Sequence, residues 1–243
     1  MKHLIIIILT LISVNLDAQT ADEILEKVDM NMSAENRIVE SSMTIHGKRN
    51  SRTMTSISYS VGDKQSFTEY LTPSREKGTK MLKLENKLWI YSPSTDRTIQ
   101  ISGHMLRQSV MGSDFSYEDM MEDRELTDVY TATKIGEEDL DGRKTFVLEL
   151  IAKVDDVSYH SRKAWIDIEH LVPLKEELFA KSGQLLKRTS LSEITKVQGR
   201  WYPMKMIYKD VLKSGKGTEM NIISIKFNQE IPEYIFTKAA LKQ

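Results

Sequence analysis

The spacing of apolar and polar residues predicts one short helix followed by a long series of β-strands. The first apolar positions recur at helical intervals: Ile24, Leu25, Val28 and Met32. Just ahead of them, Thr20 and Glu23 have the spacing of a capping box, in which each side chain accepts a hydrogen bond from the other residue's backbone amide. The pattern therefore predicts an amphipathic helix that must cover an apolar surface.

From about residue 37 the period of the pattern changes from 3.6 to 2. Alternating runs occupy 39–45, 54–59, 66–71, 80–84, 87–91, 97–101, 145–151, 160–166, 174–179, 185–191, 201–208 and 219–227, and a further strand starts near Asp128. Turn signals such as Asp141-Gly142 separate these runs. Many short strands at this spacing predict an antiparallel sheet, as a sandwich or a barrel, with one solvated face and one covered face.

One interior segment, between Ile101 and about residue 128, departs from the strand pattern. Four of its residues share a helical face: Met105, Leu106, Ser109 and Val110. Gly112 is expected to end that helix, and Ser113 or Asp114 to cap a second one that contains Tyr117 and Met121. We therefore expect two short helices that form a lid over the concave side of the sheet.

Composition narrows the class of protein. The 243-residue chain shows no linker or repeat, so we expect a single α+β domain over residues 19–243. The formal net charge is −1, from 34 basic and 35 acidic residues, which argues against a broad surface for nucleic acid. There is no cysteine, which excludes thiol catalysis, disulfides and thiolate metal sites.

The first residues have the pattern of a secretory signal peptide. Lys2 and His3 precede an apolar run from Leu4 to Ile12, and small residues follow it, so we expect cleavage after Ala18. A membrane anchor is the alternative, but the run is well short of the about 20 residues that span a bilayer. We therefore expect residues 1–18 to be a leader, and the mature chain to be soluble and located in the periplasm.

A search for catalytic and metal-binding patterns finds none that is complete. His160 and His170 could meet across a hairpin, but they lack the ligand spacing of a metal site. Residues 137–142 resemble part of a calcium loop without its final glutamate, and residues 215–218 lack the first glycine of a phosphate loop. We therefore expect a protein that is not an enzyme and needs no cofactor or metal.

Methionine is the unusual feature of the composition. Of 13 methionines, four crowd the interior segment beside Phe115 and Tyr117: Met105, Met111, Met120 and Met121. A flexible, polarizable thioether side chain repacks against irregular apolar partners and is common on promiscuous binding surfaces. Ordinary core packing is the alternative for each single residue, whereas the cluster favours a mobile apolar surface.

Four sequence strings, in this order, resemble the outer-membrane lipoprotein-sorting (LolA-like) family. They are LWIYSP at 88–93, MGSDFSYEDM at 111–120, AWID at 164–167 and WYPM at 201–204. The SDFSYED portion is specific to one branch of that family. The resemblance implies an open antiparallel β half-barrel of about eleven strands, with helices over its concave face.

The resemblance also implies a function. The best-known members bind the acyl chains of a lipoprotein in the concave cavity and carry them across the periplasm. The expected lining of cavity and lid is Trp89, Tyr91, Met105, Leu106, Val110, Met111, Phe115, Tyr117, Met120 and Met121. Arg75 is a candidate for the arginine that controls cargo release in the dedicated chaperone.

The expected partners also follow from the resemblance. The cargo is a lipoprotein, a free lipid or another hydrophobic envelope molecule, and we expect a monomeric carrier. Members of this branch often occur with RND-type exporters, so an inner-membrane RND-type transporter or an outer-membrane acceptor is the expected protein partner. The alternative is a non-enzymatic envelope sensor or accessory module that binds a membrane protein.

Overall fold

The computed structural model describes residues 19–47 and 50–243, and the predicted signal peptide lies outside the described residues. Within them, the structure contains a single antiparallel sheet of thirteen strands. The strands are β1 (Asn36–His46), β2 (Ser51–Val61), β3 (Gln65–Thr72), β4 (Lys80–Leu84), β5 (Lys87–Ser92), β6 (Arg97–Ile101), β7 (Tyr130–Leu140), β8 (Arg143–Ala152), β9 (Ser161–Asp167), β10 (Pro173–Phe179), β11 (Leu185–Val197), β12 (Arg200–Asp210) and β13 (Thr218–Phe227). The predicted open antiparallel sheet is confirmed, with thirteen strands rather than about eleven.

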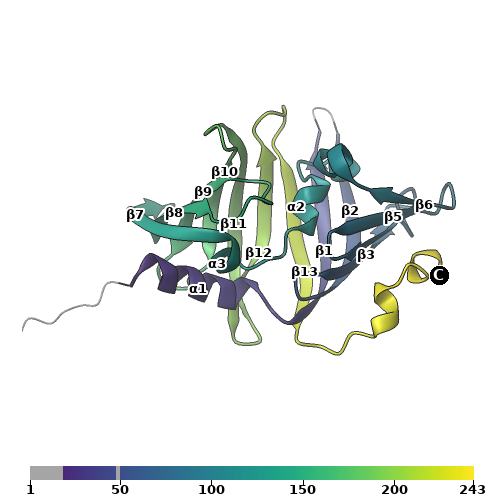
Figure 1. The fold of residues 1–243 in the computed structure, drawn as a ribbon, viewed down its shortest axis with the longest axis horizontal. Coiled ribbons are helices and arrows are strands. Elements are labelled where there is room, and N and C mark those ends of the chain that lie inside the picture. Colours follow the sequence, from purple (N-terminus) through teal and green to yellow (C-terminus); the bar gives the residue numbers. More distant parts are fainter. Residues whose placement is uncertain (1–18, 48–49) are drawn as a thin grey trace, which may run out of the picture.

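The strand order explains how one chain builds so wide a sheet. The order is β6-β5-β4-β3-β2-β1-β13-β12-β11-β10-β9-β8-β7. The chain starts in the middle, moves outward to β6 through hairpins, crosses to the opposite edge at β7, and returns through hairpins until β13 pairs with β1. Figure 1 shows the two halves of the sheet on either side of the crossing segment, which contains α2 (Tyr117–Met121).

Strand alternation gives the sheet two different faces. We call the face that contacts residues 102–129 and the N-terminal helix the inner face, and the opposite one the outer face. On β5, Leu88 packs on the inner face, whereas its neighbour Trp89 packs on the outer face. Successive side chains of a strand point to opposite sides, so each strand contributes to both faces.

The helix α1 (Ala21–Met32) covers the inner face over one half of the sheet. Its apolar side packs on strands β8 and β9: Ile24, Leu25 and Val28 contact the cluster of Phe146, Leu148, Leu150, Ala164 and Ile166. The predicted capping box is confirmed, because Thr20 and Glu23 each accept a hydrogen bond from the other's amide. Figure 1 shows α1 lying below β7 and β8.

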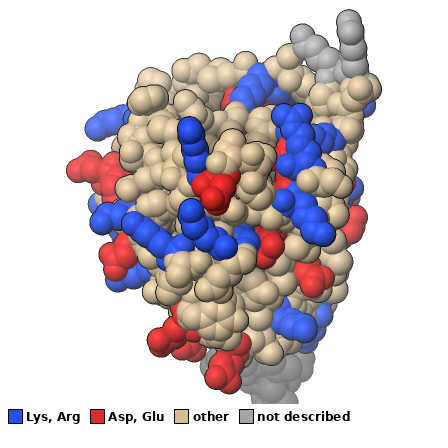
Figure 2. Space-filling model, turned by 90° about the vertical axis from the view of Figure 1, so that its right-hand side faces the viewer, with Lys and Arg blue, Asp and Glu red and all other residues tan. Residues whose placement is uncertain are grey.

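The C-terminal segment, which contains the 3₁₀ turns Glu233–Phe236 and Ala240–Lys242, covers part of the outer face. Phe236, Ala240 and Leu241 pack on Phe67, Leu82 and Trp89 of strands β3 to β5. On the side of the molecule shown in Figure 2, acidic and basic side chains are interspersed among uncharged ones, in keeping with the net charge of −1. No helix of the described residues has the length and apolar character that crossing a membrane requires.

We call the crossing segment, residues 102–129, the insert. Its secondary structure differs from the two helices that the sequence predicts. It contains two 3₁₀ turns (Gly103–Arg107 and Val110–Gly112) and two short helices, α2 (Tyr117–Met121) and α3 (Leu126–Val129). Gln108 and Ser109 are extended, with ψ angles of 154° and 131°, and this interrupts the first predicted helix. The predicted caps at Ser113 and Asp114 are wrong, because Ser116 caps α2.

Asp29 joins α1 to the insert, and its removal should destabilise the protein. Its buried carboxylate accepts hydrogen bonds from the amides of Leu126 and Thr127 and from the Thr127 hydroxyl, at 2.8 to 3.0 Å. We expect Asp29→Ala to lower the free energy of unfolding by about 2 kcal/mol in a urea titration, because these donors lose their partner. Glu26→Ala, at an exposed position of the same helix, is the control and should change it by less than about 0.5 kcal/mol. Equal effects of the two changes would contradict the role given to Asp29.

Candidate functional site

A row of four methionines crosses the middle of the inner face. Met54, Met43, Met220 and Met206 are direct neighbours in register on strands β2, β1, β13 and β12. Leu191 on β11 extends the row. Directly opposed side chains of antiparallel strands have Cβ atoms about 5 Å apart, so the row forms one continuous surface of flexible apolar side chains.

The insert packs on this surface and fills it. Val110 and Phe115 are buried there, and six further insert residues pack against the same cluster: Met105, Leu106, Met111, Tyr117, Met120 and Met121. The rings of Phe115 and Tyr208 stack at a centroid distance of 4.2 Å. Nine of the 13 methionines belong to this cluster, three of them buried and six partly buried.

Eight of the ten predicted lining residues therefore lie together, and two do not. Trp89 and Tyr91 lie on the outer face, where they pack with the cluster beneath the C-terminal segment. Placing them in the cavity was wrong, because a one-residue offset along a strand reverses the face. Their neighbours Leu88 and Ile90 occupy the inner face instead. The lining predicted from the sequence did not include Met43, Met54, Met206 and Met220. Their place in the period-two alternation of their strands was the sequence feature that could have indicated them.

Asp114 is the main polar anchor of the insert. Its carboxylate accepts hydrogen bonds from the Thr218 hydroxyl at 2.9 Å and from the Asp210 amide at 3.0 Å. The Lys187 ammonium donates to the Asp114 carbonyl at 2.7 Å and to the Asp210 carboxylate at 2.9 Å. Burial alone would raise the pKa of Asp210, but the hydrogen bond and the charge of Lys187 hold that pKa below its usual value.

Cationic side chains from strands β4 and β2 hold two interior points of the insert. The Lys83 ammonium, almost completely buried, donates to the Met121 carbonyl and lies 3.5 Å from the Asp123 carboxylate. Arg52 donates to the Met111 carbonyl. Arg75, the predicted release arginine, is 87% exposed and contacts Glu76, so it does not reach the insert.

Helix α2 is held over the inner face by two tyrosines. The Tyr159 hydroxyl donates to the Asp119 carboxylate and lies 3.1 Å from the Tyr208 hydroxyl. Burial and the nearby Asp119 carboxylate raise the pKa of Tyr159 above its usual value, so both hydroxyls stay protonated at neutral pH. Asp119 also completes the cap of α2, since it accepts a hydrogen bond from the Ser116 amide.

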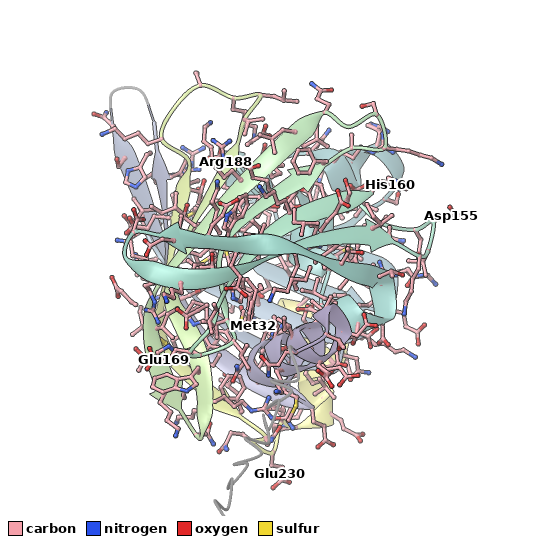
Figure 3. All side chains as sticks on the ribbon, turned by 90° about the vertical axis from the view of Figure 1, so that its left-hand side faces the viewer. Met32, Asp155, His160, Glu169, Arg188 and Glu230 are labelled. Carbon is pink, nitrogen blue, oxygen red and sulfur yellow. The ribbon has the colours of Figure 1, made fainter. Side chains whose placement is uncertain are left out.

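An open cleft of about 870 Å³ lies beside the insert. Its walls carry charged side chains of both signs, among them Lys64, Arg107, Glu118, Arg124 and Asp155. Leu106 and Met121 of the insert form apolar parts of its wall. Figure 3 shows Asp155 and Glu169 toward opposite ends of the strands, so the cleft lies toward the end marked by Asp155. The open cleft thus has a lining of mixed polar and apolar character, whereas the apolar inner face is filled by the insert.

The acidic residues and histidines that the structure describes do not gather into a metal site. They contain no group of three His, Cys, Asp or Glu side chains arranged to hold a metal ion. His170 is part of a turn, where its Nδ1 atom lies 2.8 Å from Arg143 and 3.0 Å from the Asp167 carboxylate. These contacts hold the turn beside the last residues of α1, because Asn31 donates to the His170 carbonyl.

One family model and several solved structures are similar to this chain. A family model described as an uncharacterized protein matches residues 62–243. The chain belongs to this family. Among curated proteins, none matches its sequence.

Solved structures share the fold over nearly the whole chain. One, described as an outer membrane lipoprotein-sorting protein domain from Vibrio parahaemolyticus, is 25% identical, with a TM-score of 0.79, over 92% of this chain and 98% of that one. A LolA superfamily protein from Nitrosomonas europaea is 26% identical, with a TM-score of 0.76, over 92% of this chain and 100% of that one. A DUF1329 family protein from Desulfovibrio piger is 22% identical, with a TM-score of 0.81, over 91% and 97% of the two chains. The chain has a LolA-like fold, as the resemblance implied.

Loss of the Asp114 anchor should loosen the insert while leaving the sheet intact. Asp114→Ala leaves the Thr218 hydroxyl and the Asp210 amide without their acceptor, and each unpaired buried donor costs about 1–3 kcal/mol. In deuterium-exchange mass spectrometry we expect the amides of residues 103–121 to exchange about ten-fold faster or more, and those of β8 and β9 to be unchanged.

The matched control for Asp114 is Glu118, a second acidic residue of the insert. Its carboxylate has only longer contacts, 3.7 Å to Arg107 and 3.5 Å to the Ser158 hydroxyl, so Glu118→Ala should leave the exchange rates nearly unchanged. If Asp114→Ala exchanges no faster than Glu118→Ala, Asp114 does not anchor the insert.

Proposed function

We propose that this protein is a non-enzymatic carrier that binds an acyl chain against the inner face of its sheet, beneath the insert. The observation that carries the proposal is the cluster of nine methionines shared by the inner face and the insert. Such side chains repack around apolar guests of varied shape. The LolA-like fold and the names of the similar structures support a role in the handling of lipids or lipoproteins.

In this proposal the insert leaves the inner face when cargo binds. Its apolar side chains fill the surface in the structure, so cargo must replace them contact for contact. An acyl chain gains about 0.8 kcal/mol for each methylene removed from water, or about 10 kcal/mol for a chain of 14 carbons. That gain offsets the release of a few hydrogen-bonded anchors such as Asp114 and Lys83, each worth about 1–3 kcal/mol, when the apolar side of the insert then packs on the acyl chain instead of facing water.

The polar anchors suit a segment that must detach. Hydrogen bonds to Asp114 and to the Met121 carbonyl can be exchanged for hydrogen bonds to water when the insert moves out. We propose that the protein works in the periplasm between the two envelope membranes, with an RND-type transporter or an outer-membrane acceptor as its partner.

Direct binding of an acyl probe tests the proposal. The purified chain without residues 1–18 is titrated with a fluorescent fatty acyl probe, and a second sample is extracted with solvent and examined by mass spectrometry. We expect saturable binding of about one probe per chain, with Kd at or below the micromolar range. A protein that takes up no probe and yields no lipid on extraction would rule out the carrier.

A charge placed at the edge of the inner face should weaken binding. Met121 is partly buried against the methionine cluster, and Met121→Glu would put a carboxylate where the acyl chain enters. We expect the affinity for the acyl probe to fall about ten-fold or more, because the carboxylate must be desolvated. Met30→Glu, at a methionine that is 71% exposed on α1, is the matched control and should bind like the unchanged protein. Equal affinities of the two variants would remove Met121 from the binding surface.

Transfer between membranes separates the carrier from the alternative, an envelope sensor or accessory module. A carrier moves labelled lipid from donor to acceptor vesicles at a rate that rises with protein concentration. Asp114→Ala should increase that rate, since the loosened insert opens more often. Probe binding without any transfer, together with stable capture of one membrane protein, would favour the sensor instead.

A further inference from the structure

Arg162 on β9 is an anomaly of the inner face. Its Nε atom is the one buried side-chain nitrogen or oxygen that lacks a hydrogen-bond partner among the residues that the structure describes. The side chain as a whole is 14% exposed. Buried polar groups in folded proteins are nearly always hydrogen-bonded, and a buried charge without enough partners is costly. A donor left free in this way needs an explanation.

The carboxylate of Glu176 lies beside Arg162 but accepts no hydrogen bond from the Arg162 guanidinium. A Glu176 oxygen lies 3.6 Å from the Arg162 guanidinium, beyond hydrogen-bond distance. The other Glu176 oxygen accepts a hydrogen bond from the Thr189 hydroxyl at 3.4 Å, which turns the carboxylate toward β11. The guanidinium otherwise faces two aromatic rings, Tyr130 at 4.8 Å and Tyr159 at 6.0 Å from their centroids. These neighbours keep Arg162 charged but leave part of its planar fork free.

Arg162 lies between the two apolar clusters of the inner face and beside a residue of the cleft wall. In the sheet register it lies between Leu150, which belongs to the cluster under α1, and Leu178, which belongs to the methionine cluster. Tyr159 contacts Arg162 on one side and lines the cleft on the other. The Arg162 guanidinium thus lies on the inner face, next to Tyr159 of the cleft wall.

The insert also ends close to Arg162. Burial raises the pKa of Glu122, whereas the hydrogen bond from Arg124 and the more distant charge of Arg162 bring it below its usual value. Glu122 and Arg124 both line the cleft. An anion that entered the cleft would come next to Tyr159 and Glu122, two lining residues that neighbour Arg162.

We propose that Arg162 binds an oxyanion, a carboxylate or a phosphate, that forms the headgroup of an amphiphile whose acyl chain lies on the methionine row. Guanidinium is the cation best shaped for this, because its planar fork pairs with two oxygens of one carboxylate or phosphate. The inference rests on the proposed carrier function and narrows the cargo to anionic amphiphiles. An apolar surface alone would not distinguish an acid from its ester.

A pair of probes that differ only in the headgroup tests this inference. The chain without residues 1–18 is titrated at neutral pH with a pyrene-labelled long-chain fatty acid and with its methyl ester. We expect the acid to bind about ten-fold more tightly than the ester, as one charge-assisted bidentate pair provides. Arg162→Met should weaken the acid to the level of the ester and leave the affinity for the ester within about two-fold.

Two further variants keep the test decisive. Arg188 on β11 is also paired with a glutamate, Glu177, but is 47% exposed, so Arg188→Met is the matched control and should retain the preference for the acid. Glu176→Gln keeps Arg162 and removes the competing carboxylate, so it should bind the acid more tightly than the unchanged protein does. This second variant decides the matter even if Arg162→Met fails to fold: no tighter binding of the acid would then overturn the inference.

The outcomes separate this inference from the carrier function. If neither probe binds, the carrier function itself fails. If acid and ester bind equally well to the unchanged protein, or if Arg162→Met keeps the preference, the carrier stands and the oxyanion site is overturned. A third titration with inorganic phosphate tests the source of the oxyanion: we expect much weaker binding than that of the acid, and binding as tight as the acid's would overturn the headgroup assignment.

Discussion

The inner face of the sheet must be kept away from water, and the whole arrangement follows from that constraint. Thirteen strands make a surface too wide for one helix to cover, and α1 covers only the half around β8 and β9. The insert covers the other half with residues such as Val110 and Phe115. Without it, the methionine row would be exposed, and each buried apolar side chain would lose about 1.5–3 kcal/mol of burial.

The insert packs on the sheet through apolar side chains and is also held by hydrogen bonds to its backbone carbonyls. Short 3₁₀ turns and a five-residue helix leave many carbonyls without partners inside the segment, and cations of the sheet supply the donors. Lys187 and Lys83 reach the carbonyls of Asp114 and Met121 from opposite halves of the sheet. The insert is therefore held at Asp114 and Met121 by hydrogen bonds that water can replace, and by apolar contacts that a hydrocarbon chain can replace.

The same physics explains the string GSDFSYED at 112–119. Gly112 adopts a positive φ, Asp114 binds strands β12 and β13, and Phe115 stacks on Tyr208. Ser116 and Asp119 then cap α2 reciprocally, and Asp119 also accepts from Tyr159. Each residue type in the string thus meets one local requirement, and most of these requirements involve strands that are distant in the sequence.

The sequence by itself determined the features that depend on near neighbours. The capping box of Thr20 and Glu23, the period of two along the strands, and the cluster of methionines at 105–121 all arise within a few residues, so the pattern predicts them. The tertiary structure decided what depends on register across the sheet: that Met43 lies beside Met220, that Trp89 belongs to the outer face, and that the Nε atom of Arg162 has no hydrogen-bond partner among the described residues. Side-chain alternation says that a strand has two faces, but only pairing with neighbouring strands says which face is covered and by what.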